Sequence, residues 1–279
     1  MAIPKEEIDL LISVIKSVAG YDFSDYSERS FNRRIEKVLV DNKLDVKSLM
    51  NKLKTDSGFV ERVVKDITVN TTELFRDPKV WQTIRYRILP KYQEQRTINI
   101  WHAGCSTGQE VYSMLILLNE MNLFDRANVF ATDINLDVLE AAKSGEYKYR
   151  FNLNYLDSFN KVIRENPYNY DEFYDVPYDK YFDVDKIKDT YKMKPMLLKK
   201  PLFRKHDLVN EGNIFYTKFD IIMCRNVLIY FNSQLQNKIF EMFYQSLFSK
   251  GCLILGAHES MSGPITAKFK KKGIVYIKK

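Results

Sequence analysis

Residues 97–110 read Thr97-Ile98-Asn99-Ile100-Trp101-His102-Ala103-Gly104-Cys105-Ser106-Thr107-Gly108-Gln109-Glu110, and this stretch decides the fold. Alternating apolar residues predict a β-strand up to Trp101, and the apolar spacing from Val111 to Leu118 predicts a helix after the glycine-containing turn. A second unit follows, with a predicted strand over 128–133 and a predicted helix over Leu136–Ser144. Such strand–helix alternation predicts a mostly parallel sheet with helices on both faces.

The same pattern continues to the C-terminus. Strands are predicted over 219–224, 252–255 and 273–277, with a helix over 233–248 between the first two. These segments add further strands to the same α/β sheet.

Two other parts of the chain depart from this pattern. Residues 4–66 have helical periodicity, and the stretch between Tyr147 and Lys200 is rich in tyrosine and too long for a plain loop. We therefore predict an N-terminal helical domain over 1–70 and an α/β domain over 71–279. We expect an inserted subdomain, with helices and a small sheet, at about 147–200.

Composition excludes several classes of protein. The chain has 279 residues, 45% hydrophobic and 28% charged, which is ordinary for a folded globular protein. No apolar run approaches the ~20 residues that a bilayer requires, and no signal peptide is evident, so we expect a cytoplasmic protein without membrane insertion. The three cysteines are widely spaced, which argues against a disulfide framework or a metal site. The net charge of +7 favours an acidic partner without identifying it.

The turn and the second strand together suggest a cofactor site. Gly104 and Gly108 permit tight backbone geometry and close approach of a ligand, and Asp133 ends a strand where an acid can accept hydrogen bonds from ribose hydroxyls. The turn lacks the full glycine spacing expected for a dinucleotide pyrophosphate. A nucleoside cofactor without phosphates, such as S-adenosylmethionine, fits better. Taken singly, the turn can be purely structural and Asp133 can be a helix cap.

Four motifs in order resemble the CheR family of chemotaxis receptor methyltransferases. They are Asn70-Thr71-Thr72-Glu73-Leu74-Phe75-Arg76, the turn Gly104–Glu110 with Val111-Tyr112-Ser113, Ala131-Thr132-Asp133-Ile134, and Cys224-Arg225-Asn226-Val227-Leu228-Ile229-Tyr230-Phe231. The resemblance implies a small N-terminal all-α domain followed by a Rossmann-like S-adenosylmethionine-dependent methyltransferase domain. It also implies esterification of glutamate side chains on chemoreceptors, with S-adenosylhomocysteine as product.

The resemblance also implies a role for individual residues. Asp133 would bind the ribose of the cofactor, Asp207 and Leu208 would flank its adenine, and Arg76 and Tyr230 would be catalytic. The implied cofactor-binding set is Asn70, Thr72, Arg76, Gly104, Glu110, Asp133, Asp207, Leu208, Asn226 and Val227. No metal ion is implied.

An ionised glutamate substrate needs no strong general base, because its reference pKa is about 4.3. Accordingly, the three histidines show no catalytic pairing in the sequence, and structural roles are expected for His102 and His206. Arg76 would orient the carboxylate, and Tyr230 would position it. As alternatives, Arg76 can pair with Asp77 on the surface, and Tyr230 can be a packing residue.

The second predicted helix, Glu28–Val40, carries a candidate docking surface for the acidic helical bundle of a chemoreceptor. Arg29, Arg33, Arg34 and Lys37 are its basic residues, several on one face, and an ordinary solvated face is the alternative. No glycine occurs between Gly145 and Gly212, whereas relatives that grip a receptor's C-terminal pentapeptide have glycines in their insertion. We therefore expect methylation without such a tether. The oligomeric state is open, with a monomer as the default expectation.

Two rival functions remain. Basic charge and abundant aromatic residues suit a nucleic-acid methyltransferase, but Cys224-Arg225-Asn226 stands where amino-methylating enzymes of that class have Pro-Pro-Tyr. A non-catalytic regulator that senses S-adenosylmethionine is the second rival. Such a sensor needs neither Arg76 nor Tyr230, and both are present.

Overall fold

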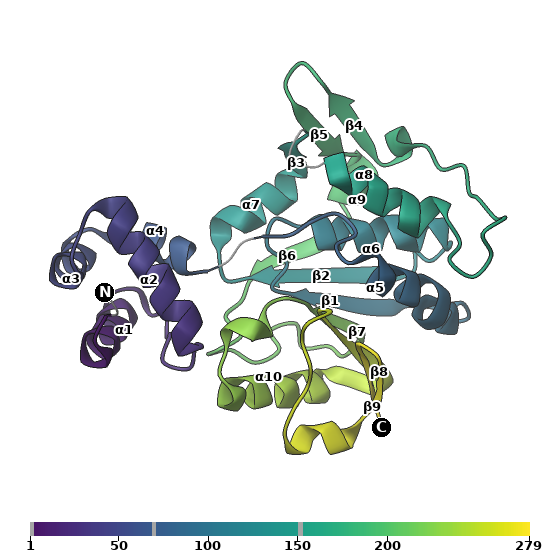
Figure 1. The fold of residues 1–279 in the computed structure, drawn as a ribbon. Helices are drawn as coiled ribbons and strands as arrows, with labels where there is room; N and C mark the ends of the chain where they lie inside the picture. Colours follow the sequence, from purple (N-terminus) through teal and green to yellow (C-terminus); the bar gives the residue numbers. More distant parts are fainter. Residues whose placement is uncertain (1–2, 69–70, 150–152) are drawn as a thin grey trace.

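A computed structural model describes residues 3–68, 71–149 and 153–279 (Figure 1). Its N-terminal part consists of four helices: α1 (Lys5–Ala19), α2 (Glu28–Asn42), α3 (Val46–Thr55) and α4 (Ser57–Ile67). Asp45 and Asp56 cap α3 and α4, because each side chain accepts a hydrogen bond from a backbone N–H of the first turn. The apolar faces of the four helices form a hydrophobic core of their own.

The rest of the chain is built on a seven-stranded sheet in the order β6-β2-β1-β7-β8-β10-β9. Five neighbouring strands are parallel, and β10 and β9 complete one edge in antiparallel orientation. The strands are β1 (Ile98–Ala103), β2 (Ala127–Asp133), β6 (Pro201–Lys205), β7 (Phe219–Cys224), β8 (Leu247–Leu255), β9 (Phe269–Lys272) and β10 (Val275–Lys278).

Helices cover both faces of this sheet. Ile98 and Ile100 of β1 face one core with α5 (Pro78–Thr83), α6 (Gln109–Glu120) and α7 (Leu136–Ser144). Trp101 and Ala103 face the opposite core with α10 (Ser233–Ser246). Successive side chains of a β-strand point to opposite faces of the sheet, so β1 contributes to both cores, as the predicted α/β architecture requires. Short helical turns complete the chain at Ile84–Ile88, Leu89–Tyr92, Asn160–Arg164, Tyr178–Lys180, Leu228–Tyr230 and Pro264–Lys268.

The inserted stretch forms a small antiparallel sheet, in the order β3-β5-β4, beside the main one (Figure 1). Its tyrosines pack together: the rings of Tyr147 and Tyr191 are 5.1 Å apart, and those of Phe182 and Tyr191 are 5.6 Å apart. These aromatic residues belong to the same hydrophobic core as Ile98 and Ile100, so the insertion extends the core on that face of the main sheet. Elements of the insertion are β3 (Glu146–Lys148), α8 (Leu153–Phe159), β4 (Phe182–Asp185), β5 (Thr190–Met193) and α9 (Pro195–Leu198).

The C-terminal edge differs from the sequence prediction. The strand predicted over 273–277 is β10 at Val275–Lys278, because Gly273 has φ +63° and turns the chain in a hairpin. Its partner β9, with three consecutive lysines, was not predicted. Among the described residues, no helix is long and apolar enough to cross a membrane.

Candidate active site

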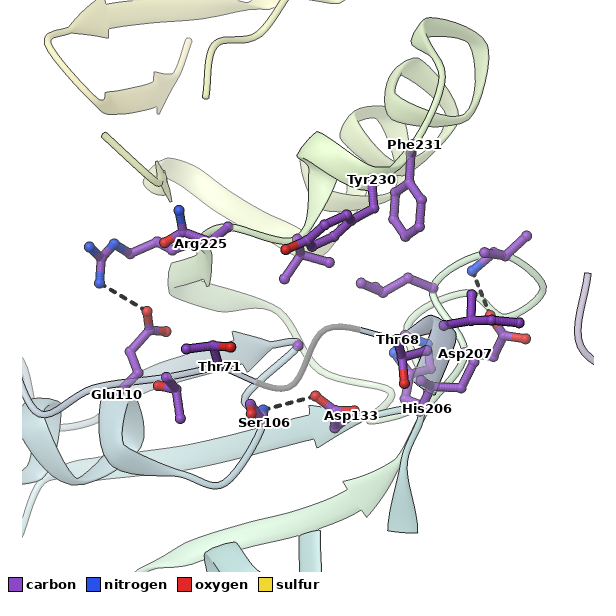
Figure 2. Close-up of a pocket in the computed structure, with 18 of the residues that line it drawn as sticks. Thr68, Thr71, Ser106, Glu110, Asp133, His206, Asp207, Arg225, Tyr230 and Phe231 are labelled. Atoms are coloured by element: carbon purple, nitrogen blue, oxygen red, sulfur yellow. Dashed lines mark hydrogen bonds and ion pairs between the residues drawn. The ribbon is translucent and has the colours of Figure 1, made fainter. Parts of the chain in front are cut away.

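One pocket at the carboxyl ends of β1, β2 and β7 collects the predicted site residues (Figure 2). Its empty volume, including the open mouth, is about 950 Å³. Asn70 falls outside the described residues. The other residues predicted to bind the cofactor or to be catalytic all line the pocket, namely Thr72, Arg76, Gly104, Glu110, Asp133, Asp207, Leu208, Asn226, Val227 and Tyr230.

The glycine turn after β1 has the backbone shape that the sequence suggested. Gly104 has φ +79°, and a Cβ atom there would lie 2.4 Å from Cγ2 of Val227. Gly108 has φ +87°, and its Cβ would lie 2.8 Å from that of Ala142 in α7. Both glycines are therefore required by conformation and by close packing.

Replacing Gly104 by alanine should weaken cofactor binding. The new methyl group would push Val227 into the pocket, and the left-handed backbone would be strained by about 1–2 kcal/mol. We expect about a tenfold loss of affinity for S-adenosylhomocysteine by calorimetry. Gly58→Ala, on an exposed part of α4, is the matched control and should bind normally. Unchanged affinity in Gly104→Ala would contradict the assigned role of this turn.

Asp133, at the end of β2, is held by backbone donors. Its Oδ2 accepts a hydrogen bond from Ser106 N at 2.8 Å, and its Oδ1 accepts one from Asn135 N at 3.0 Å. Burial raises the pKa of Asp133, although these hydrogen bonds oppose the increase. The cap of α7 is Asn135, whose side chain accepts from Asp137 N. The alternative reading of Asp133 as that helix cap is therefore wrong, and its carboxylate faces the pocket.

Glu110 belongs to a hydrogen-bonded network that includes Arg225 in the pocket wall. It accepts hydrogen bonds from His102 Nδ1 at 2.9 Å and from Arg225 Nη1 at 3.1 Å, and Nη2 of Arg225 also reaches Asp77 Oδ2 at 2.9 Å. Burial alone would raise the pKa of Glu110, but the bond to His102 and the charge of Arg225 hold it below its usual value. Arg225, with a side chain only 1% exposed, therefore braces the end of β7.

Arg76 and Tyr230 line the same pocket. Asp77 pairs with Arg225, so the alternative of a surface pair between Arg76 and Asp77 is wrong. Arg76 Nη1 donates to the carbonyl oxygen of Thr71 at 3.4 Å, and no carboxylate among the described residues pairs with it. Burial raises the pKa of Tyr230, while the charges of Arg34, Arg76 and Arg33 act in the opposite direction. The phenol therefore lies within the field of these cations.

Glu259 was not predicted as part of the site. Its Oε2 accepts hydrogen bonds from Asn226 N at 2.7 Å and Gly256 N at 2.8 Å. Its Oε1 accepts from Leu228 N at 2.9 Å and Ile229 N at 3.3 Å. One carboxylate thus holds the backbone that carries Asn226 and Tyr230. An acid shortly after the last parallel strand was the only sequence signal for it.

The turn after β6 carries Asp207 and Leu208, the two residues predicted to flank the adenine. Asp207 Oδ1 accepts a hydrogen bond from Val209 N at 2.8 Å, and its Oδ2 accepts one from Asn210 Nδ2 at 2.8 Å, so this side chain shapes the turn that contains Leu208. His206 is buried, and its Nε2 lies 2.8 Å from the carbonyl oxygen of Gly212. Burial lowers its pKa, which favours the neutral ring expected of a structural histidine.

The pocket residues fit an adenosyl cofactor. Ser106 is buried in the pocket wall, and its hydroxyl has no hydrogen-bond partner among the described residues. Asp133, the residue predicted to bind the ribose, lines the pocket with a carboxylate, and Leu208 and Val227 add apolar surface. Buried polar groups normally have partners, so the Ser106 hydroxyl is consistent with a ligand in this space.

The candidate docking helix α2 runs close to the pocket. Arg29, Arg33 and Lys37 are exposed and Arg34 is half-buried. Lys37 forms an ion pair with Asp41, so its charge is partly compensated. Ser27, immediately before the helix, donates its backbone N–H to the carbonyl oxygen of Tyr230 at 2.7 Å. The basic helix and the predicted catalytic tyrosine are therefore directly connected.

Comparison with known proteins identifies the family. Residues 6–68 match the family model described as "CheR methyltransferase, all-alpha domain", and residues 70–161 and 164–276 match "CheR methyltransferase, SAM binding domain". A protein of Pseudomonas putida KT2440 named as a methyltransferase, Cher3, is 34% identical over 91% of this chain and 89% of its own length. A chemotaxis protein methyltransferase of Listeria innocua is 30% identical over 94% of each chain, and one of Pseudomonas aeruginosa PAO1 is 30% identical over 77% of this chain and 75% of its own. The chain belongs to the CheR family of S-adenosylmethionine-dependent methyltransferases.

Proposed function

We propose that this enzyme methylates glutamate side chains of chemoreceptors and so forms glutamate methyl esters. The observation that carries the proposal is the position of Arg76. Its guanidinium lines the cofactor pocket with Tyr230, and no described carboxylate neutralises it. A cation without an acidic partner beside the reaction site favours an anionic acceptor such as a carboxylate.

The chemistry that the pocket must support is modest. S-adenosylmethionine, when bound, supplies a methyl group on a positively charged sulfur. A glutamate carboxylate is already ionised near neutral pH, so no residue has to remove a proton. The described histidines fit this requirement: His102 bonds to Glu110, and His206 bonds to a backbone carbonyl.

The residues of the chain then act by positioning. Arg76 orients the incoming carboxylate, and the Tyr230 hydroxyl donates a hydrogen bond that fixes one of its oxygens. Glu110 and Asp133 hold the cofactor in register, while Thr72, Gly104, Asn226 and Val227 form the surrounding wall. Proximity and alignment of this kind can supply roughly 7–11 kcal/mol of rate enhancement.

The direct test is incubation of the enzyme with radiolabelled S-adenosylmethionine and a chemoreceptor cytoplasmic fragment. We expect base-labile methanol release, which reports glutamate methyl esters. Binding of the cofactor without methanol release would indicate a regulator, and base-stable label in DNA or RNA would indicate a nucleic-acid methyltransferase. Either result would refute the proposed function.

The receptor's acidic helical bundle should dock on α2. The basic residues of α2 lie beside Tyr230, and the charges of Arg33 and Arg34 reach that phenol. The insertion has no glycine between Gly145 and Gly212, so we propose that docking does not require a C-terminal pentapeptide on the receptor. The acceptor region of such a receptor is cytoplasmic, and we place the enzyme there.

Charge reversal on α2 tests this docking surface. The double variant Arg33→Glu/Arg34→Glu should lower the rate of receptor methylation about tenfold at low salt, because it removes electrostatic steering of an acidic partner. The defect should shrink as salt screens the charges. S-adenosylhomocysteine affinity should stay within twofold of the wild type. Charge reversal at Arg62, a basic residue on α4, is the control and should leave methylation unchanged.

A further inference from the structure

The segment before α2 joins the helical part of the chain to the catalytic loop. Tyr26 pairs with Phe231 as an isolated antiparallel bridge, and Ser27 N donates to Tyr230 O at 2.7 Å. On the other side of this bridge, Asn232 N donates to Asp25 O at 2.8 Å, and Asn232 Nδ2 donates to Asp25 Oδ1 at 2.9 Å. Two segments about 200 residues apart in sequence are therefore connected by a short, regular ladder.

The side chain of Tyr26 enters the cofactor pocket from this ladder. It lines the same cavity as Asp133, Asp207 and Leu208, the residues predicted to contact the ribose and adenine of the cofactor. Its ring packs edge-on against Phe23 at 4.7 Å and against Phe231 at 5.0 Å between centroids. These aromatic contacts fix the direction of the side chain, so the hydroxyl has a defined position.

The Tyr26 hydroxyl is available to a ligand. No hydrogen bond to it is found among the described residues, although it lines the pocket together with Asp133 and Asp207. Burial, together with the nearby charges of Asp207 and Asp133, raises the pKa of Tyr26, so the phenol keeps its proton. A protonated phenol beside two carboxylates is a hydrogen-bond donor in a site otherwise rich in acceptors.

We propose that Tyr26 binds the nucleoside half of the cofactor, and that the cofactor thereby fastens the N-terminal helices to the catalytic loop. Because α2 begins at Glu28, two residues after Tyr26, cofactor binding also steadies the basic helix at the mouth of the site. The cofactor pocket is completed by the helical part of the chain and does not lie within the α/β sheet alone. This inference concerns cofactor binding and holds whatever the methyl acceptor is.

The first test is calorimetry on Tyr26→Phe, which removes the hydroxyl and keeps the aromatic packing. We expect about a three- to tenfold loss of affinity for S-adenosylhomocysteine, the effect of one hydrogen bond. The same factor is expected for 5′-methylthioadenosine, which has the nucleoside but lacks the amino-acid end. Tyr21→Phe is the matched control, since the Tyr21 hydroxyl bonds Lys205 Nζ at 3.1 Å and is not among the residues lining the pocket. Affinity within twofold for both ligands, or a loss confined to S-adenosylhomocysteine, would overturn the proposal.

The second test is hydrogen exchange of the full chain with and without S-adenosylhomocysteine. Bound ligand should slow exchange at Ser27 N and Asn232 N, the two amides of the ladder, as well as in the turn Gly104–Glu110. In Tyr26→Phe the ladder should lose this protection while the turn retains it at saturating ligand. The comparison of free and liganded wild type needs no variant, so it tests the coupling even if Tyr26→Phe folds poorly. Unprotected ladder amides in the liganded wild type would refute the coupling.

Discussion

Arg76→Ala should lower kcat for ester formation by about 10²- to 10³-fold, the usual effect of removing one charged group that acts on the reacting atoms. Arg76 lines the pocket with Tyr230 and has no carboxylate partner among the described residues, so its charge is available to the substrate. Without it, the incoming carboxylate loses its orienting contact. The rate should be measured at saturating S-adenosylmethionine, so that weaker cofactor binding does not contribute.

Two further variants make this test specific. Arg76→Lys keeps the charge without the forked donor geometry and should recover only part of the rate. Arg87→Ala removes an exposed arginine that is absent from the pocket lining and should behave as the wild type. Near-normal ester formation in Arg76→Ala, with cofactor bound, would exclude Arg76 from the reaction.

Glu259→Ala should have the largest effect on stability among the residues around the site. Its carboxylate accepts hydrogen bonds from four backbone N–H groups, three of them at 2.9 Å or less. Removing it leaves these donors without an acceptor, and we expect a loss of roughly 3 kcal/mol in the free energy of unfolding. Urea titration measures this loss, and a similar effect is not expected for the exposed neighbour His258→Ala.

The same substitution should also affect the site. Asn226 has φ +59°, a backbone conformation that few residues adopt without support, and its N–H is one of the four donors. Without the hydrogen bonds to the Glu259 carboxylate, the loop carrying Asn226 and Tyr230 should relax, and both S-adenosylhomocysteine affinity and kcat should fall. Glu259→Gln keeps one acceptor oxygen, so its stability, affinity and kcat should lie between those of the wild type and those of Glu259→Ala. Wild-type stability in Glu259→Ala would show that solvent or other groups satisfy the loop.

The sequence predicted the elements whose ends are marked by capping residues. The helix Leu136–Ser144 has the predicted ends because Asn135 caps its start and Gly145, with φ +56°, ends it. Strand β9 was missed because Phe269-Lys270-Lys271-Lys272 has no alternating apolar pattern, and its only cue is pairing with β10. The sequence predicted a small sheet in the insertion. It did not predict that β3 pairs with β5, because these strands are more than 40 residues apart and their pairing depends on the tertiary fold.

The site was predictable to the extent that its residues occur in motifs. Thr72, Glu110, Asp133 and Asn226 come from four separate motifs, and the structure brings them to one pocket. Contacts made outside those motifs were not predictable. Tyr26 reaches the pocket from the helical part of the chain, and Glu259 acts on backbone groups about 30 residues away. Such contacts depend on the folded path of the chain and leave no local pattern.

Strand β9, which contains three consecutive lysines, forms one edge of the seven-stranded sheet and so affects self-association. An unpaired strand can recruit a second sheet, and adjacent copies would then place Lys270, Lys271 and Lys272 against the same residues of a neighbour. Lys271 lies across from Tyr276 on β10 and covers its ring, with Nζ 5.5 Å from the centroid, which hides apolar surface. We expect like-charge repulsion along this edge to disfavour pairing of two copies through β9.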